Sequence, residues 1–172
     1  EAWVYFRSFN ELAGIVSKYQ SSGAEGYTLR LSRTSPYNEI DFDGVQTTGA
    51  DLETNKWYHI AGVNDNGDRR IYIDGEEMST INSPEFMSAF PNSDPVKIGC
   101  DFNSRYLNGQ VDDVRVWSKA RSTSEIVGTK NSILSGTESG LVLYFIFESE
   151  ATAGGDNSDF TVVEDESNRN ND

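Results

Sequence analysis

The sequence predicts an all-β protein, folded as one antiparallel β-sandwich that carries a single short helix. Three observations predict this class. Short alternating or apolar runs recur at close intervals, separated by clusters of Gly, Asn, Asp and Ser. The pairs Asn66-Gly67 and Asp74-Gly75 lie between such runs and favour tight β-hairpins. The chain has 172 residues, of which 36% are hydrophobic, so it can build one core and leaves little room for a second domain.

The runs give nine candidate strands in chain order. They cover residues 2–7, 14–19, 27–32, 39–42, 57–64, 69–73, 96–99, 109–117 and 140–147. The turn at residues 64–68 joins the fifth strand to the sixth, and the Asp74-Gly75 turn follows the sixth. The first turn therefore predicts a hairpin, and the second predicts a tight turn after the sixth strand.

One helix is predicted after the eighth strand. Ser122-Thr123-Ser124-Glu125 matches the capping box, in which a Ser hydroxyl and a Glu carboxylate satisfy free backbone N–H groups at a helix start. We expect the helix to run to about Thr129 and to have a structural role.

The end of the chain differs in composition from the rest. We expect residues 1–149 to form the sandwich and residues 150–172 to form an acidic, polar tail. The patch at residues 160–163 is a candidate strand that the tail would contribute. The chain opens directly on strand-like residues at Glu1, so we expect it to be a piece of a larger multidomain or repeat protein.

The charge of the chain excludes several partner classes. There are 28 Asp and Glu residues against 14 Lys and Arg, which gives a net charge of −14. Such a domain repels phosphate backbones and anionic lipid headgroups, so nucleic acid is not an expected partner. No apolar run approaches the roughly 20 residues of a membrane span, so membrane insertion is not expected either. The charge suits a neutral glycan, a cationic partner or bound divalent cations, or solubility alone.

Five motifs in order carry a resemblance to a known family. They are Glu-Ala-Trp-Val at residues 1–4, Trp-Tyr-His-Ile-Ala at 57–61, Tyr-Ile-Asp-Gly at 72–75, Ile-Gly at 98–99, and Gly-Gln-Val-Asp-Asp-Val-Arg-Val at 109–116 followed by the capped helix. Together they resemble the laminin-G-like and pentraxin-like domains of the concanavalin A-like lectin/glucanase superfamily. The resemblance covers most of residues 1–148, and it identifies the predicted sandwich as laminin-G-like.

This resemblance implies an antiparallel jelly-roll sandwich located outside the cell or on its surface, with glycan or extracellular protein ligands and often a calcium ion. Strands that usually precede Glu-Ala-Trp are absent here, while segments near residues 143–148 and 163–168 are similar to the start of such domains. Either the boundaries are shifted within a repeat array, or the tail supplies a strand that normally comes first.

A possible catalytic set lies at Glu39, Asp41 and Asp43. It resembles the acidic strand of retaining glycosidases that share this sandwich, but that motif ends in Glu rather than Asp43. On a regular strand, positions four apart lie about 13 Å from each other, against roughly 5–5.5 Å for two carboxylates in retaining catalysis. We therefore expect no enzyme here, and a glycosidase using Glu39 and Asp43 is the least favoured alternative.

Two single residues have structural interpretations. His59 is the only histidine, so a metal site with several His ligands cannot form, and a Ser/His/Asp triad could use no other histidine. We expect the His59 side chain to be half-buried and hydrogen-bonded to the backbone. Cys100 is the only cysteine, so no intrachain disulfide is possible. Asp112 and Asp113 open a strand, and we expect one of them to point inward and either accept backbone N–H bonds or pair with a cation such as Arg115.

Calcium has two candidate positions. The ion takes six to eight oxygen ligands, usually from carboxylates and carbonyls on loops. The loop at residues 100–106 corresponds to the pentraxin-like ligand loop and offers Asp101 and Asn103. The second candidate is Asp165, in a segment similar to one that holds a structural ion in related domains.

Sugar binding needs an aromatic face to stack on a ring and planar polar side chains for hydroxyl groups. Phe102, Asn103, Arg105 and Tyr106 form the densest such group on a predicted loop. The sequence thus predicts an extracellular, non-catalytic binding or adhesion module that recognises a glycan or surface ligand, with calcium as its expected cofactor. The alternative is a calcium-stabilised structural repeat or spacer without its own ligand.

Overall fold

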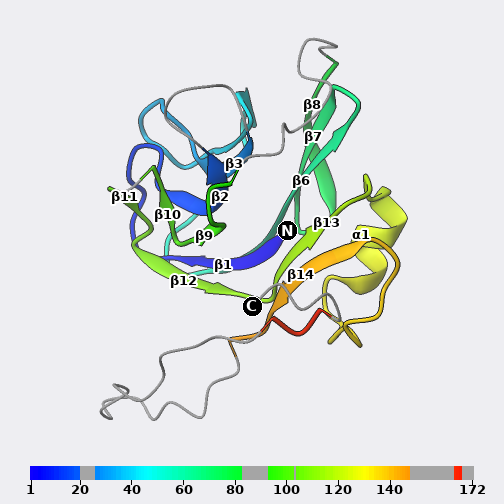
Figure 1. Cartoon of the computed structure of the whole chain (residues 1–172). Coiled ribbons are helices and arrows are strands. Elements are labelled where there is room, and N and C mark those ends of the chain that lie inside the picture. The colour runs from blue at the N-terminus through cyan, green and yellow to red at the C-terminus, as the bar shows by residue number, and fades with distance from the viewer. Residues whose placement is uncertain (20–25, 83–92, 103, 148–164, 168–172) are drawn as a thin grey trace, which may run out of the picture.

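The computed structural model describes residues 1–19, 26–82, 93–102, 104–147 and 165–167. Its elements in chain order are β1 (Ala2–Phe6), β2 (Gly14–Tyr19), β3 (Gly26–Leu31), β4 (Ile40–Phe42), β5 (Val45–Gln46), β6 (Trp57–Asp65), β7 (Asp68–Ile73), β8 (Glu76–Asn82), β9 (Lys97–Ile98), β10 (Cys100–Asp101), β11 (Arg105–Tyr106), β12 (Gly109–Asp112), β13 (Val114–Trp117), α1 (Thr123–Thr129) and β14 (Leu141–Phe145). Every strand pair is antiparallel, so the predicted all-β sandwich with one short helix is confirmed (Figure 1).

Two five-stranded sheets form the sandwich. Sheet A has the order β12-β1-β6-β7-β8, and sheet B has the order β5-β4-β3-β2-β9. Alternation along the strands points one set of side chains into the space between the sheets. Val4 and Phe6 of β1 meet Leu29 and Ile40 of sheet B there in one buried cluster. Trp3 and Tyr5 therefore point to the outer face of sheet A.

Helix α1 covers part of that outer face. Ile126 of the helix is buried against Ala61, Val63 and Tyr72 of sheet A, which form a second, smaller core. The predicted capping box is confirmed, because the Glu125 N–H donates to the Ser122 hydroxyl at 3.3 Å and the Ser122 N–H donates to the Glu125 carboxylate at 2.8 Å. Figure 1 shows α1 beside β13 and β14, on the opposite side of the molecule from β9–β11.

The predicted hairpin and the predicted second turn are both present, and the second turn also forms a hairpin. Asn66 and Gly67 have φ values of 51° and 95°, and Asp74 and Gly75 have φ values of 54° and 89°. Two consecutive positive φ values match the type I′ turn, which suits the twist of antiparallel strands. These turns join β6 to β7 and β7 to β8.

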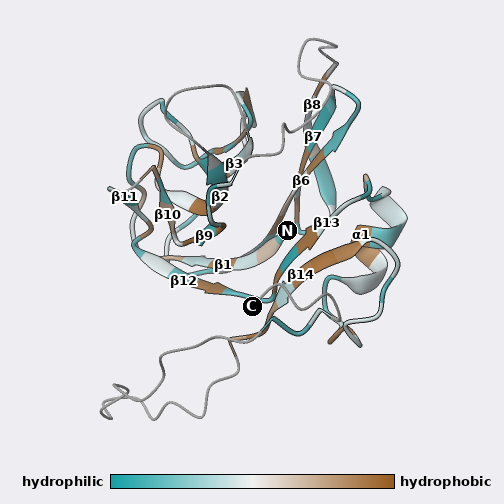
Figure 2. Cartoon of the chain, viewed as in Figure 1, coloured by the Kyte–Doolittle hydropathy of each residue, from teal (hydrophilic) through white to brown (hydrophobic). Residues whose placement is uncertain are grey.

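The predicted strand at residues 109–117 is split in two. Asp113 has a φ of 52°, which interrupts the extended backbone between β12 and β13. As a result β12 pairs with β1 while β13 pairs with β14. Figure 2 shows that β14 is largely hydrophobic, whereas the edge strand β8 is mostly hydrophilic.

The described part of the predicted tail lies along β14. The Glu166 N–H donates to the Tyr144 carbonyl at 2.7 Å, and the Ser167 hydroxyl donates to the Val142 carbonyl at 3.0 Å. The candidate strand at residues 160–163 lies outside the described residues, and the boundary between residues 149 and 150 stays a prediction. In the part of the chain that the structure describes, no helix is long and apolar enough to cross a bilayer.

Candidate functional site

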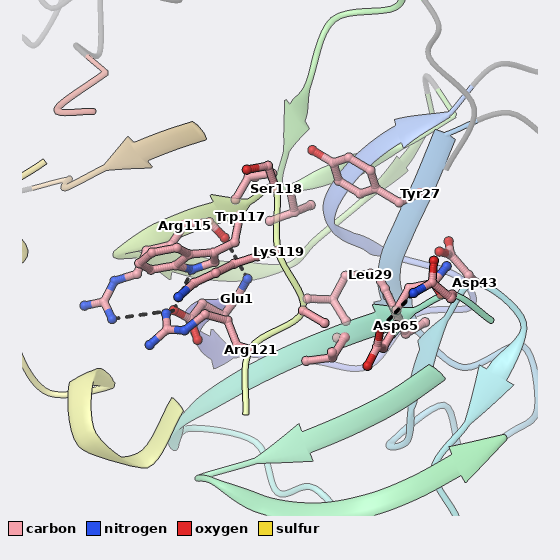
Figure 3. A pocket seen from close by; sticks show the side chains of 18 residues that line it. Glu1, Tyr27, Leu29, Asp43, Asp65, Arg115, Trp117, Ser118, Lys119 and Arg121 are labelled. Atoms are coloured by element: carbon pink, nitrogen blue, oxygen red, sulfur yellow. Dashed lines mark hydrogen bonds and ion pairs between the residues drawn. The ribbon is translucent and has the colours of Figure 1, made fainter. Parts of the chain in front are cut away.

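A cavity of about 500 Å³ opens where the two sheets part at one end of the sandwich. We call it the end cavity. Its walls come from β3 and β4 with Tyr27 and Asp43, from the β6–β7 hairpin with Asp65, and from β13 and the residues after it with Trp117. Glu1 and Val16 of β2 also line it. Figure 3 shows Trp117, Lys119 and Arg121 on one side of the cavity and Tyr27 and Asp43 on the other, with Leu29 between them.

Gly62 gives the cavity its base. It lies on β6 and faces Phe42 of β4 in the opposite sheet, and both residues line the cavity. A Cβ atom on residue 62 would collide with the Phe42 ring. The absence of a side chain therefore lets the two sheets approach and leaves the Phe42 ring at the cavity wall.

Asp43 is held in place by backbone contacts. It has a φ of 48°, a conformation that Asp and Asn adopt more readily than most residues. Its Oδ1 accepts a hydrogen bond of 2.6 Å from the Thr28 N–H, and its carbonyl accepts one from the Arg69 guanidinium. Burial raises the pKa of the Asp43 carboxyl to about 6.

Tyr27 lies next to Asp43 at the same wall. Burial, with a smaller contribution from the negative charge of Asp43, raises the pKa of the Tyr27 phenol to about 12. The phenol is therefore neutral at physiological pH and can donate a hydrogen bond. The wall thus offers a hydrogen-bond donor and a carboxylate acceptor side by side.

Trp117 is fixed on the opposite wall. Its indole N–H donates to the Glu1 carboxylate at 3.0 Å, and the Arg121 guanidinium lies 4.0 Å from the ring centroid. Arg121 is itself anchored by the Glu125 carbonyl at 2.8 Å and the Thr129 hydroxyl at 2.9 Å. The half-buried indole is therefore held in one orientation beside the cavity.

Beneath Trp117, Arg115 is fully buried. Its Nε donates to the Asp113 carboxylate at 3.0 Å, and its two terminal nitrogens donate to the carbonyls of Thr129 at 2.9 Å and Ser132 at 2.7 Å. The expectation that Asp112 or Asp113 pairs with Arg115 is confirmed for Asp113. This network ties β13 to the turn after α1.

The three carboxylates considered for catalysis are separated in the structure. Strand β4 spans only Ile40–Phe42, so Glu39 and Asp43 lie outside it. Glu39 accepts hydrogen bonds from the Gly49 N–H at 2.8 Å, the Ala50 N–H at 3.2 Å and the Thr47 hydroxyl, and it does not line the end cavity. Asp41 pairs with Arg30 at 3.0 Å. Glu39 and Asp43 therefore have separate protein partners, and of the two only Asp43 lines the end cavity.

The loop predicted to bind sugar forms the β10–β11 hairpin. Tyr106 is 65% exposed, Phe102 is 36% exposed, and the Arg105 guanidinium lies 5.5 Å from the Phe102 ring centroid. Asn103 lies outside the described residues. None of the described residues of this hairpin lines the end cavity, so the structure offers two separate candidate surfaces.

The two predicted calcium positions are both occupied by protein contacts. The Asp101 carboxylate is fully buried and lies 2.8 Å from Arg30 and 3.4 Å from Arg105, so two positive groups already surround it. Asp165 accepts from the N–H groups of Tyr144 and Ser167, each at 2.9 Å, and from the Ser167 hydroxyl at 2.9 Å. The described residues contain no group of three or more His, Cys, Asp or Glu side chains that could hold a metal ion. Calcium stays a prediction that these contacts do not favour.

His59 differs from its expected environment. It is 1% exposed rather than half-buried, and its ring nitrogens have no hydrogen-bond partner among the described residues. The ring packs against Trp3 with a centroid distance of 5.5 Å, and burial lowers its pKa to about 3. It is therefore a neutral core residue at physiological pH.

The end cavity has no local signal in the sequence. Its walls come from residues 27, 43, 65 and 117, which are far apart in the chain. From the sequence alone, Asp65 belongs to the predicted turn at residues 64–68 and Asp43 to the possible catalytic set. Only the pairing of the sheets brings them together.

Two solved structures with a similar fold are a candidate carbohydrate-binding protein and a domain of an arabinanase. A candidate carbohydrate-binding protein from Bacteroides ovatus has a TM-score of 0.76 and 24% identity, and the match covers 95% of this chain and 47% of that one. Domain 4 of AbnA, an extracellular GH43 arabinanase from Geobacillus stearothermophilus solved in complex with arabinotriose, has a TM-score of 0.57 and 16% identity, and the match covers 74% of this chain and 63% of that one. The chain thus spans about half the length of the first of these proteins. No curated protein sequence matches the chain.

The family comparison agrees with the fold. The Laminin_G_3 family, described as the concanavalin A-like lectin/glucanases superfamily, matches residues 1–127. That stretch contains both main sheets and most of α1. The chain belongs to the Laminin_G_3 family of the concanavalin A-like lectin/glucanase superfamily.

Proposed function

We propose that this chain is a non-catalytic glycan-binding module and that its ligand enters the end cavity. The observation that carries the proposal is the composition of the cavity walls. Two aromatic side chains, Tyr27 and Trp117, face a space of about 500 Å³ beside the Asp43 carboxylate. This volume lies within the range of small-molecule sites in proteins.

The chemistry of the walls suits a neutral sugar. An aromatic ring packs against the C–H face of a sugar ring, while hydroxyl groups need fixed donors and acceptors. Tyr27 supplies a neutral phenol, and Asp43 supplies a carboxylate acceptor above pH 6. The hydrogen bond from the Thr28 N–H to Asp43 and the Arg121 contact with Trp117 orient these groups before a ligand binds.

The solved structures with a similar fold also support a glycan-binding role. One similar structure is a candidate carbohydrate-binding protein, and another is an arabinanase domain solved with arabinotriose. In this chain Glu39 is held by the turn at residues 47–50 and is absent from the cavity lining, which favours binding over glycoside hydrolysis. We further propose that the module is extracellular and belongs to a larger protein.

Isothermal titration calorimetry with arabino-, xylo- and gluco-oligosaccharides, chosen after a glycan array, tests the proposal. Tyr27→Phe removes the phenol oxygen and keeps the ring, and Asp43→Asn keeps the shape and the Oδ1 acceptor. We expect each variant to weaken binding by about tenfold or more, which corresponds to about 1.4 kcal/mol.

The exposed hairpin provides the matched control. Tyr106→Ala leaves the end cavity intact and should bind like the wild type. If Tyr106→Ala abolishes binding while the two cavity variants do not, the β10–β11 hairpin is the glycan site, as the sequence analysis predicted. Silence on the array would favour the structural spacer. Release of reducing ends from any of these glycans would contradict a non-catalytic role.

A further inference from the structure

A pair of aromatic residues lies on the outer face of sheet A, with Trp57 exposed and Tyr5 half-buried. Tyr5 of β1 and Trp57 of β6 are cross-strand partners, and their ring centroids lie 5.6 Å apart at an interplanar angle of 52°. Trp57 is 39% exposed, although a tryptophan is usually well buried. We call these two residues the outer aromatic pair. It belongs to neither the end cavity nor the β10–β11 hairpin.

The position of α1 explains why this pair is open. The preceding row of the same face consists of Trp3 and His59, which are also cross-strand partners. The Trp3 indole N–H donates to the Lys130 carbonyl at 2.7 Å, at the end of α1, and so this row is covered. The next row, two residues later on β1 and two residues earlier on β6, is the outer aromatic pair.

Amide side chains flank the pair on both sides. Asn55 accepts a hydrogen bond of 3.3 Å from the Tyr5 hydroxyl, and its backbone N–H donates to the Phe6 carbonyl at 2.7 Å. Gln110 of β12 is the cross-strand partner of Tyr5 on its other side, and it is exposed. Its side chain has no hydrogen-bond partner among the described residues. An aromatic face bordered by planar amides can stack on a sugar ring and bind its hydroxyl groups.

The size of this surface argues against a protein partner. At 39% exposure, Trp57 presents about 100 Å² of the 150–250 Å² that a large aromatic side chain buries in full contact. A stable protein–protein interface buries about 800 Å² on each partner. The exposed residues around the pair are polar, including Asn55, Lys56 and Gln110. The occupant that fits is therefore one sugar ring rather than a second protein.

The angle between the rings narrows the class of glycan. Two rings tilted by 52° cannot both lie flat on one plane, so they do not match the planar face of a crystalline polysaccharide. They match a single chain whose ring stacks on Trp57 while Tyr5 supports the indole. We propose that the outer aromatic pair is a second glycan-binding site, which stacks one ring of a neutral, soluble polysaccharide chain.

This site is separate from the end cavity. Trp57 starts β6 and faces outward, whereas Gly62 and the β6–β7 hairpin line the cavity at the other end of the same strand. The five steps of extended chain from Trp57 to Gly62 span roughly 17 Å. A single sugar ring in the cavity therefore does not contact the pair. The inference rests on the proposed function only in taking glycans as the ligands.

Affinity electrophoresis with soluble arabinan, xylan and mixed-linkage β-glucan, together with titration of short oligosaccharides, tests the inference. The variants are Trp57→Ala, Trp57→Phe and Asp43→Asn. We expect Trp57→Ala to weaken retardation by the polysaccharide about tenfold and to leave oligosaccharide binding in the cavity unchanged. Trp57→Phe keeps a ring and should retain part of the affinity. Polysaccharide should also shift the tryptophan fluorescence of the wild type, and this shift should be smaller in Trp57→Phe.

The outcomes separate the two proposals. If Asp43→Asn has no effect and Trp57→Ala does, the outer aromatic pair stands and the cavity proposal fails. If Trp57→Ala, with a melting temperature like that of the wild type, binds every polysaccharide as the wild type does, the second site is overturned. It is also overturned if sedimentation shows that the wild type is a dimer and Trp57→Ala a monomer, because the pair would then contact a second copy of the chain.

Discussion

Gly62 of sheet A lies directly against the ring of Phe42 in sheet B, where any larger residue would collide with that ring. The contact sets the distance between the two sheets at the base of the end cavity. Gly62→Ala must therefore displace the Phe42 ring, since the φ of residue 62 is not in the positive range and the backbone itself tolerates alanine.

We expect Gly62→Ala to lower the free energy of unfolding by about 1–3 kcal/mol, the usual cost of overpacking a core. Glycan affinity should fall as well, because Phe42 also lines the cavity. Chemical denaturation and calorimetry measure the two effects. Gly128→Ala is a suitable control, because a Cβ at residue 128 meets open space. A Gly62→Ala protein as stable as the wild type would contradict the packing described here.

Asp43 should make the stability of the protein depend on pH. The pKa of its carboxyl is about 6 in the folded protein and near 3.8 in the unfolded chain, because burial disfavours the charge. Between these values the folded state holds a proton that the unfolded state has released. The free energy of unfolding should therefore fall as pH rises from about 4 to about 6, by at most about 3 kcal/mol.

Asp43→Asn removes this ionisation, keeps the acceptor for the Thr28 N–H and tolerates the positive φ of the site. Urea unfolding at a series of pH values should show a smaller decrease in the variant over this window. Parallel pH profiles for the two proteins would show that Asp43 does not titrate in the way described.

Arg115 should be essential for stability. Its side chain is fully buried. Its loss leaves the Asp113 carboxylate without its ion-pair partner and the carbonyls of Thr129 and Ser132 without their guanidinium donors. We expect Arg115→Met to cost about 3–5 kcal/mol, as for other broken buried ion pairs. Arg70→Met is the matched control, because Arg70 pairs at the surface with Asp68 at 3.1 Å and should cost less than about 1 kcal/mol. Equal effects in thermal melts would show that burial of Arg115 does not matter.

Calcium removal tests the sequence-based metal prediction. Asp165 already accepts three hydrogen bonds from Tyr144 and Ser167. We therefore expect EDTA to leave the melting temperature unchanged and Asp165→Ala to lower it. If EDTA instead lowers the melting temperature by several degrees, and Asp165→Ala removes that effect, Asp165 is a calcium ligand as the sequence resemblance implied.

The fold could be predicted because its signals are local. The alternation along β1, the Asn66-Gly67 turn and the Ser122–Glu125 capping box each depend on residues within a few positions of one another. Strand β8 was missed, since Glu76 and Glu77 at its start and its edge position give it no clear apolar alternation. The division between β12 and β13 was missed because it depends on one backbone torsion at Asp113.

The candidate site could not be predicted in the same way. Aromatic residues on a predicted loop, such as Tyr106, can be recognised in a sequence, and they were the predicted sugar-binding residues. A cavity depends on what the folded chain leaves empty, and this one depends on the absence of a side chain at Gly62. The ion pairs of Asp101 could not be predicted either, because its two arginine partners come from β3 and β11 and no local pattern indicates their approach.

Strand β6 is the middle strand of sheet A, with β1 hydrogen-bonded on one side and β7 on the other. Residues 57–60 pair with β1 and residues 60–65 pair with β7, so these two ladders fix the spacing between the two ends of the strand. If both ends hold the same polymer, the second contact forms at a high effective concentration, and avidity will depend on chain length rather than on sugar identity alone. Long glycans should then be retained where their own short fragments wash away.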